Sequence, residues 1–266
     1  MTTKPYPQEA TFFAFRVIFS VVGLVFLVMG TVGLAAAGAV GGAEIGATAF
    51  VLVFYIVLIA GYFWLMKVLA VGHLKGNGVQ VTEKQFPQAT AMIAEVASLY
   101  GMKRIPKVFV LQSGGALNAY ATRFAGSNFV ALYSDVFSVI EHDPQVLKFI
   151  LSHEMAHVKR SHIQKRFWTF LSFWVPFLGP AYSRACEYTC DSFAAEAAPQ
   201  GAPGGLMLLA AGKDLYRKVS VEDYLEAFKE NNTDVVKFTQ LLSSHPHLPK
   251  RIAYLAKLVP TAPLMN

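Results

Sequence analysis

Two long stretches without charge dominate the first quarter of the chain. Val17 to Ala43 contains no Asp, Glu, Lys or Arg, and Ile45 to Met66 is a second such run. A helix needs about 20 apolar residues to span a bilayer, so each run is long enough for one crossing. Gly38, Gly41 and Gly42, at the end of the first run, predict the turn between the two spans. The pattern therefore predicts a transmembrane helical hairpin within residues 1–75, with spans at about 17–40 and 45–66.

From Gly76 onward, shorter periods of apolar and polar positions replace these runs. Apolar residues at helical or strand spacing predict the following elements: helices over 86–100, 135–140 and 145–166, further helices after Gly205, and strands over 105–111, 117–121 and 128–133. A proline-rich break interrupts the last helices at His245 to Pro249. Residues 76–266 are therefore predicted to form a mainly α domain with a small β-sheet, an α+β fold.

Charged residues set the expected orientation of the hairpin. Only Glu44 lies between the two runs, whereas basic residues flank their outer ends at Lys4, Arg16, Lys67, Lys75 and Lys84. Basic flanks stay on the cytoplasmic side of a membrane, so both ends of the hairpin, and the domain that follows, are predicted to be cytoplasmic. The chain would then be a multi-pass protein of the cell (inner) membrane.

Composition agrees with a membrane protein and argues against a nucleic-acid partner. Apolar residues make up 54% of the chain and charged residues only 15%, against roughly 25% charged in soluble domains. The formal net charge is +6, but the basic residues do not form a stripe interleaved with aromatic side chains. Two cysteines, Cys186 and Cys190, cannot make a disulfide framework, which suits the cytoplasm.

Residues 150–158 carry the clearest chemical motif. His153 and His157 are four residues apart, so on a helix both imidazoles project from one face and can bind one metal ion. Glu154 lies beside the first histidine and can act as the general base on a metal-bound water. The neighbouring residues are apolar, so these polar side chains would be buried, at a cost unless they serve a site.

A catalytic zinc site needs a third protein ligand and an open position. In one known arrangement of zinc ligands, a glycine and a third histidine follow the second histidine by three and six residues. This chain has Arg160 and Ile163 at those positions. Glu187 and Asp191 are also spaced i, i+4. One of these carboxylates can bind the metal while the other orients a ligand histidine.

The chain resembles the HtpX-like and CAAX-prenyl-protease-like family of integral membrane zinc metallopeptidases. The resemblance covers most of residues 80–260 and rests on five segments in the same order as in that family: 106–111, 117–121, 153–157, 183–191 and 245–252. It implies a zincin-like domain of the gluzincin type that binds one Zn²⁺ per chain. The residues it implies are the ligands His153, His157 and Glu187, the base Glu154, the supporting carboxylate Asp191, the oxyanion-stabilising His245 and Arg251, and the substrate-binding edge strand at Asn118, Ala119 and Tyr120.

One segment departs from the family pattern. HtpX-like members have two further spans between the histidine helix and the ligand glutamate, whereas this chain offers only the proline-containing segment 167–183. It is too short for two crossings, and one crossing would place His157 and Glu187 on opposite sides of the bilayer. The segment is therefore predicted to be interfacial, re-entrant or a buried lid.

Together these features predict a membrane-anchored zinc endopeptidase. The resemblance implies polypeptide substrates that are misfolded or membrane-bound, hydrolysed by attack of a zinc-bound water that Glu154 activates. The alternative is a catalytically inactive membrane scaffold or binding module on the same fold. Among other polar residues, Cys190 is interpreted as a small buried hydrophobe. His162, five residues after His157, is interpreted as a solvated histidine that faces away from the metal.

Overall fold

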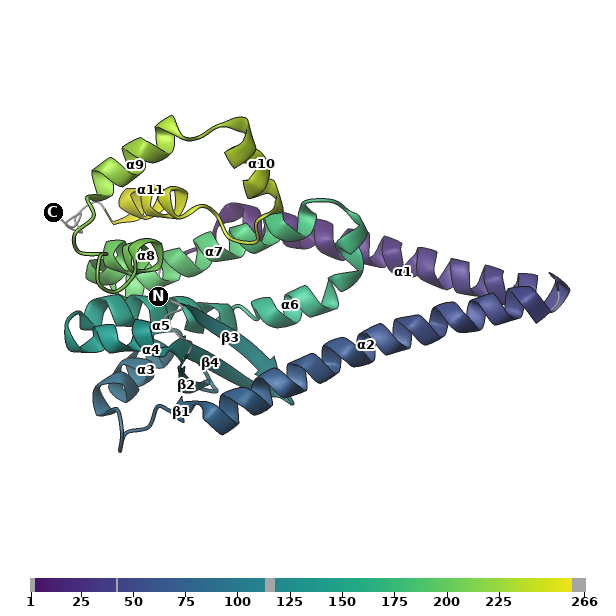
Figure 1. Ribbon diagram of the computed structural model, residues 1–266, viewed down its shortest axis with the longest axis horizontal. Coiled ribbons are helices and arrows are strands. Elements are labelled where there is room, and N and C mark those ends of the chain that lie inside the picture. Colours follow the sequence, from purple (N-terminus) through teal and green to yellow (C-terminus); the bar gives the residue numbers. More distant parts are fainter. Residues whose placement is uncertain (1–2, 42, 113–117, 260–266) are drawn as a thin grey trace.

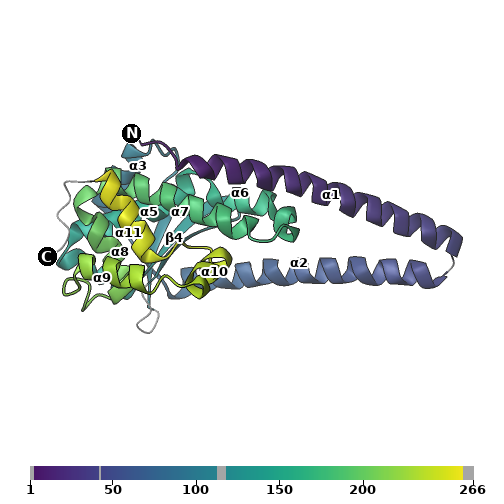
Figure 2. The ribbon, with the colours of Figure 1, turned by 90° about the horizontal axis from the view of Figure 1, so that it is seen from above.

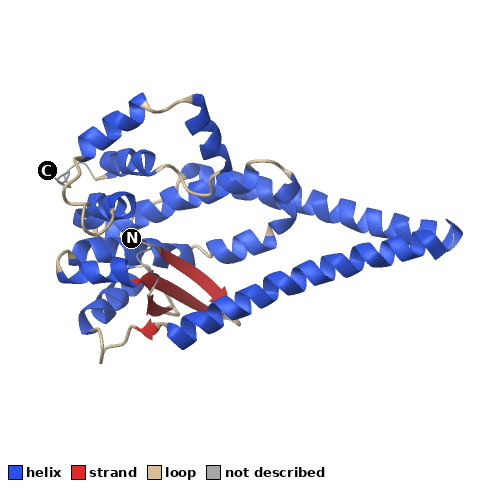
Figure 3. Cartoon of the chain, viewed as in Figure 1, coloured by secondary structure: helices blue, strands red, loops and turns tan. Residues whose placement is uncertain are grey.

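The structure is a computed structural model that describes residues 3–41, 43–112 and 118–259. The helices are α1 (Pro7–Gly41), α2 (Ala43–Asn77), α3 (Pro87–Leu99), α4 (Ser134–Phe137), α5 (Pro144–Lys159), α6 (His162–Trp168), α7 (Leu178–Ala197), α8 (Ala202–Ala211), α9 (Val221–Glu230), α10 (Asp234–Leu242) and α11 (Leu248–Leu258). Short 3₁₀ turns are η1 (Ser138–Glu141), η2 (Phe170–Trp174) and η3 (Pro199–Gly201). The strands are β1 (Val79–Gln80), β2 (Lys107–Leu111), β3 (Ala119–Phe124) and β4 (Ser127–Tyr133). The predicted mainly α fold with a small β-sheet is confirmed (Figure 3).

Helices α1 and α2 form two arms that meet at a tip far from the rest of the molecule (Figures 1 and 2). Both are long and apolar enough to cross a membrane, and their apolar side chains are largely exposed along the arms. An exposed apolar surface of this extent is stable when lipid covers it. The turn predicted at the glycines between the arms includes Gly42, which lies outside the described residues.

The four strands form one mixed sheet in the order β1-β2-β4-β3. Strands β2 and β4 are parallel, and the two outer pairs are antiparallel. Successive side chains of a strand point to opposite faces, so Val108 and Val130 join the main core with α5 while Phe109 and Phe129 face the other way. β3 remains an edge strand, and α5 lies beside it.

The two arms of the hairpin attach to different parts of the domain. The last turns of α2 contribute Val71 and Leu74 to a small core on the outer face of the sheet. The start of α1 instead packs on α7, where the rings of Tyr6 and Tyr188 lie 5.0 Å apart. The domain is therefore held between the arms, with α1 on its helical side and α2 on its sheet side (Figure 1).

The prediction of one continuous helix over 145–166 is wrong. α5 ends at Lys159 and α6 starts at His162, because Ser161 adopts a left-handed conformation with φ of 56°. A left-handed residue cannot continue a right-handed helix. The break changes the direction of the chain and, with it, the position of His162.

Segment 167–183 contains the end of α6, the turn η2 and the first turns of α7, and it folds back beside α1 (Figure 1). The Nε1–H of Trp174 donates to the carbonyl of Phe19 over 3.2 Å. Six large aromatic side chains are exposed along this segment: Phe167, Trp168, Phe170, Phe173, Trp174 and Phe177. Aromatic side chains gather at the membrane–water interface, so an interfacial position stays our prediction for this segment.

Candidate metal centre

Helix α5 carries the first two candidate ligands through the middle of the domain. It starts at Pro144, and the side chain of Asp143 caps it by accepting from the N–H of Val146 over 3.4 Å. Pro at the first helical position and Asp at the cap are both favourable at a helix start. The helix is buried on nearly all sides, so the rings of His153 and His157 have fixed surroundings.

Helix α7 packs along α5 and brings Glu187 to the same place. Glu187 is 2% exposed. Its Oε2 lies 3.3 Å from Nε2 of His153, and its Oε1 lies 3.3 Å from Nε2 of His157. The two histidine Nε2 atoms are 3.2 Å apart. The predicted ligands, which are far apart in the sequence, therefore converge on one point.

These spacings fit a tetrahedral zinc site. Donor atoms at about 2.0–2.1 Å from zinc in a tetrahedron are separated from one another by roughly 3.3 Å. Each pair of candidate donor atoms has nearly this separation. Two imidazoles and one carboxylate also leave a fourth position free, as a catalytic site requires.

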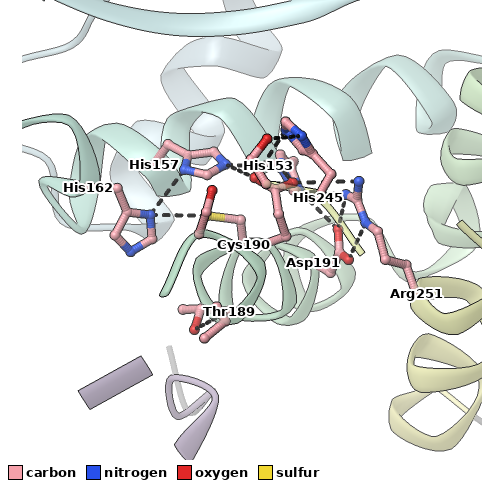
Figure 4. Close-up of polar contacts among 12 residues, drawn as sticks. His153, His157, His162, Thr189, Cys190, Asp191, His245 and Arg251 are labelled. Atoms are coloured by element: carbon pink, nitrogen blue, oxygen red, sulfur yellow. Dashed lines mark hydrogen bonds and ion pairs between the residues drawn. The ribbon is translucent and has the colours of Figure 1, made fainter. Parts of the chain in front are cut away.

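Asp191 supports this group from the next turn of α7. Its Oδ1 accepts from Nδ1 of His153 over 2.9 Å, and both of its oxygens accept from Arg251 of α11, over 2.8 Å from Nε and 2.7 Å from Nη2 (Figure 4). Because His153 then carries its proton on Nδ1, its Nε2 can offer a lone pair to a metal. Asp191 is fully buried, so this arrangement is shielded from water.

Charges inside the site shift its pKa values. Burial raises the pKa of Asp191, but the Arg251 guanidinium and the bond from His153 outweigh it and hold this pKa below its usual range. For Glu187 the effect of burial is likewise outweighed, by hydrogen bonds from His153 and His157, and its pKa lies well below normal. Burial lowers the pKa of His153, but its two carboxylate partners raise it to about 10. Metal binding would therefore displace a proton from this imidazole.

Comparison with known proteins identifies the family. The family described as "Peptidase family M48" matches over residues 83–179 and 167–259, which together span most of the globular domain. The chain belongs to peptidase family M48. A crystal structure of S. mikatae Ste24p is also similar, with 14% sequence identity and a TM-score of 0.47, covering 91% of this chain and 66% of that one. No curated protein sequence matches the chain.

Three further residues of this M48 chain were predicted to take part in catalysis. Glu154 follows His153 on α5 and is buried. Arg251 is also buried, and its Nη1 lies 3.5 Å from Oε2 of Glu187. His245 precedes α11, and its Nε2 lies 3.6 Å from Oε1 of Glu187 while 62% of its side chain is exposed. A side chain exposed to this extent can contact a substrate. The catalytic roles of all three residues stay our predictions.

The predicted substrate-binding residues of the M48 domain lie at the edge of the sheet. Ala119 and Tyr120 begin β3, and the carbonyl of Asn118 accepts from the N–H of Tyr133 over 3.0 Å. Leu117, which was included in the predicted strand, lies outside the described residues. Among the described residues, β3 pairs with β4 alone, and its other edge is predicted to pair with an extended peptide by β-augmentation.

Two residues near the candidate metal centre were missed from the sequence. His162 was interpreted as solvated, but this is wrong: it is 1% exposed, and its Nδ1 lies 3.0 Å from Nδ1 of His157. Burial lowers the pKa of His162 to about 4. Glu9, at the start of α1, is equally buried, and its Oε1 lies 3.2 Å from Nε2 of His162. In the sequence, Glu9 stands out only as a charged residue ahead of the first apolar run.

The two cysteines are free and buried. Cys190 belongs to the main hydrophobic core, and its sulfur is close to the ligand nitrogens of His153 and His157. Burial raises the pKa of Cys186 to about 12 and that of Cys190 well above its usual value. Both thiols are therefore protonated at neutral pH in the metal-free protein.

Proposed function

We propose that this chain is a membrane-anchored zinc endopeptidase of the M48 family. The observation that carries the proposal is the near-equal separation of the three donor atoms on His153, His157 and Glu187. When bound there, zinc would polarise the scissile carbonyl and lower the pKa of a water molecule to about 7. A peptide added to the edge of β3 would lie along α5 and so reach these residues.

The side chains of the chain itself have distinct roles in this proposal. Glu154 takes a proton from the attacking water and later delivers it to the leaving amine. His245 and Arg251 stabilise the negative charge that develops on the carbonyl oxygen of the substrate. Asp191 holds the His153 ring in the tautomer that leaves Nε2 free.

The substrates we propose are unfolded or membrane-bound polypeptides, cleaved in a quality-control role. Edge-strand binding recognises an extended backbone, which an unfolded segment offers more readily than the interior of a folded protein. The aromatic residues of segment 167–183 and the apolar helices α1 and α2 would keep the site close to the bilayer surface, on the cytoplasmic side. A reporter fused after Asn266 should be active in the cytoplasm, and activity on the opposite side would reverse this orientation.

Purified protein should contain about one zinc per chain and cleave casein as an unfolded substrate. Glu154→Gln should keep its zinc but lose activity by roughly a thousandfold, because proton transfer is removed and the ligands stay. Glu187→Ala should lose the zinc as well. The exposed Glu230 at the end of α9 offers a matched control, and Glu230→Gln should change neither property.

The competing function, an inactive membrane scaffold, predicts different results. Wild-type protein would then hold zinc without cleaving casein, and Glu154→Gln would change nothing. Unchanged zinc content in Glu187→Ala would instead show that another residue supplies the third ligand.

A further inference from the structure

A chain of polar contacts leads from candidate ligand His157 to the membrane helix α1. The break after α5 turns His162 back so that its Nδ1 meets Nδ1 of His157 at 3.0 Å (Figure 4). On the other side of the same ring, Nε2 lies 3.2 Å from Oε1 of Glu9. His162 and Glu9 are almost completely buried. Each therefore needs its partner, because a buried polar group without one is costly.

Only one placement of protons satisfies this chain when His157 holds a metal. The Nε2 of His157 faces His153 and Glu187, so it must offer its lone pair to the metal. A neutral imidazole carries one N–H, which in His157 is then on Nδ1 and donates to Nδ1 of His162. The N–H of His162 is consequently on Nε2, where it donates to Glu9. Both nitrogens of the His162 ring, Nδ1 of His157 and Oε1 of Glu9 thus have complementary partners.

Glu9 is itself held in position. Nη2 of Arg160 donates to its Oε1 over 2.9 Å, and Nζ of Lys165 lies 3.5 Å from the same oxygen. The start of α1 is fixed on α7 as well, because the N–H of Tyr6 donates to Oγ1 of Thr189 over 3.0 Å. A carboxylate anchored in this way can orient a histidine ring, as metal-site carboxylates do.

We propose that His162 and Glu9 are positioning residues for the metal ligand His157. The membrane anchor therefore takes part in the metal centre through the N-terminal end of α1. This inference rests on the proposed zinc site. His153 receives the equivalent support directly from Asp191 within the domain, so the two ligand histidines are oriented from different parts of the chain.

A second metal ion is the competing interpretation of this cluster. Glu9, His162 and Cys186 bring three possible ligand atoms close together. However, two cationic side chains already contact Oε1 of Glu9. A metal cation would have to displace this positive charge, so the hydrogen-bonded chain is favoured.

The test measures zinc affinity of the full-length protein in detergent by competition with a chromophoric chelator. His162→Leu removes both ring nitrogens and should weaken zinc binding by about 10–100-fold, the usual effect of losing a partner of a ligand histidine. In His162→Asn, the side-chain oxygen lies near the former Nδ1 and can accept from His157, so the loss should be only about threefold. Glu9→Gln should weaken binding by roughly tenfold.

Cobalt-loaded protein gives an independent measurement. The visible absorption of bound Co²⁺ depends on ligand geometry, so it should shift in His162→Leu and return towards wild type in His162→Asn. Trp174→Phe is the matched control, because Nε1 of Trp174 donates to the carbonyl of Phe19 and so holds α1 to the domain away from Glu9 and the histidines. Its zinc affinity should equal that of wild type.

The outcomes separate this inference from the proposed function. If wild type binds zinc and His157→Ala does not, while His162→Leu keeps wild-type affinity and spectrum, the positioning role is wrong. Equal losses in His162→Asn and His162→Leu would also reject it, since the acceptor would not matter. Two zinc ions per wild-type chain, one of them lost in Glu9→Gln, would establish the second metal site instead. Zinc retained by His157→Ala would overturn the proposed metal centre itself.

Discussion

Removing the carboxylate of Asp191 should expose the cost of an unpaired charge in the core. Asp191 is fully buried and accepts three hydrogen bonds, two from Arg251 and one from His153. In Asp191→Ala the guanidinium stays buried but loses its main partner. Breaking a buried pair in this way usually costs 3–5 kcal/mol. Because Nη1 of Arg251 keeps Glu187 at 3.5 Å, we expect the lower end, about 3 kcal/mol.

The same substitution should weaken metal binding. Without the acceptor at Nδ1, the His153 ring can rotate and change its tautomer. Zinc affinity should therefore fall about 10–100-fold, which corresponds to roughly 1.4–2.8 kcal/mol. The effect on stability and the effect on affinity are separable, because stability is measured with a chelator present.

The assay is denaturant unfolding of the detergent-solubilised protein in the presence of EDTA, compared with the double variant Asp191→Ala, Arg251→Met. The double variant removes the charge that the single variant leaves unpaired. We expect it to be more stable than Asp191→Ala, since replacing a whole buried ion pair by apolar groups is often nearly neutral. A loss below about 1 kcal/mol in Asp191→Ala, or a double variant with the summed losses of both single variants, would refute this reasoning.

Two further predictions concern packing and thiol reactivity. A Cβ at Gly201 would collide with the backbone carbonyl of Gln145 in the first turn of α5, so Gly201→Ala should lower the free energy of unfolding by about 1–3 kcal/mol. Gly76 has open space around it, so Gly76→Ala is the control. Equal unfolding midpoints for the two alanine variants would contradict the prediction. Cys186 and Cys190 are buried thiols with raised pKa values. Iodoacetamide at pH 8 should therefore label neither cysteine in the folded protein and both after denaturation, as measured by mass spectrometry. Fast labelling of the folded chain would contradict this prediction and mean that this part of α7 opens readily.

Much of the fold followed from local patterns. The two uncharged runs predicted the arms of the hairpin, and helical and strand spacing predicted α3, β2 and β4 closely. β1 was missed, because two residues are too short to form a pattern and their pairing depends on Phe109 and Val110 of β2. Such a strand exists only through its partner.

The candidate metal centre was predicted where spacing along a helix decides which side chains meet. His153 and His157 share a face of α5, and Glu187 and Asp191 share a face of α7. His162 was misplaced because the argument from spacing assumed that the helix continued past Arg160. A single left-handed residue ended it, and no pattern of apolar positions announces such a residue. Glu9 was missed because its partners are more than 150 positions away, at Arg160 and His162.

The docking of α1 on the domain bears on how a soluble fragment of this protein would behave. A fragment starting at Gly76 would lack every residue of the hairpin, including the carboxylate that now neutralises Arg160 and Lys165 beside the His162 ring. Arg160 and Lys165 would then lie close together without the carboxylate of Glu9 between them, next to the His162 ring that orients His157. Deletion of the two membrane helices to obtain a soluble fragment would therefore also remove a residue that helps to position the candidate metal ligands.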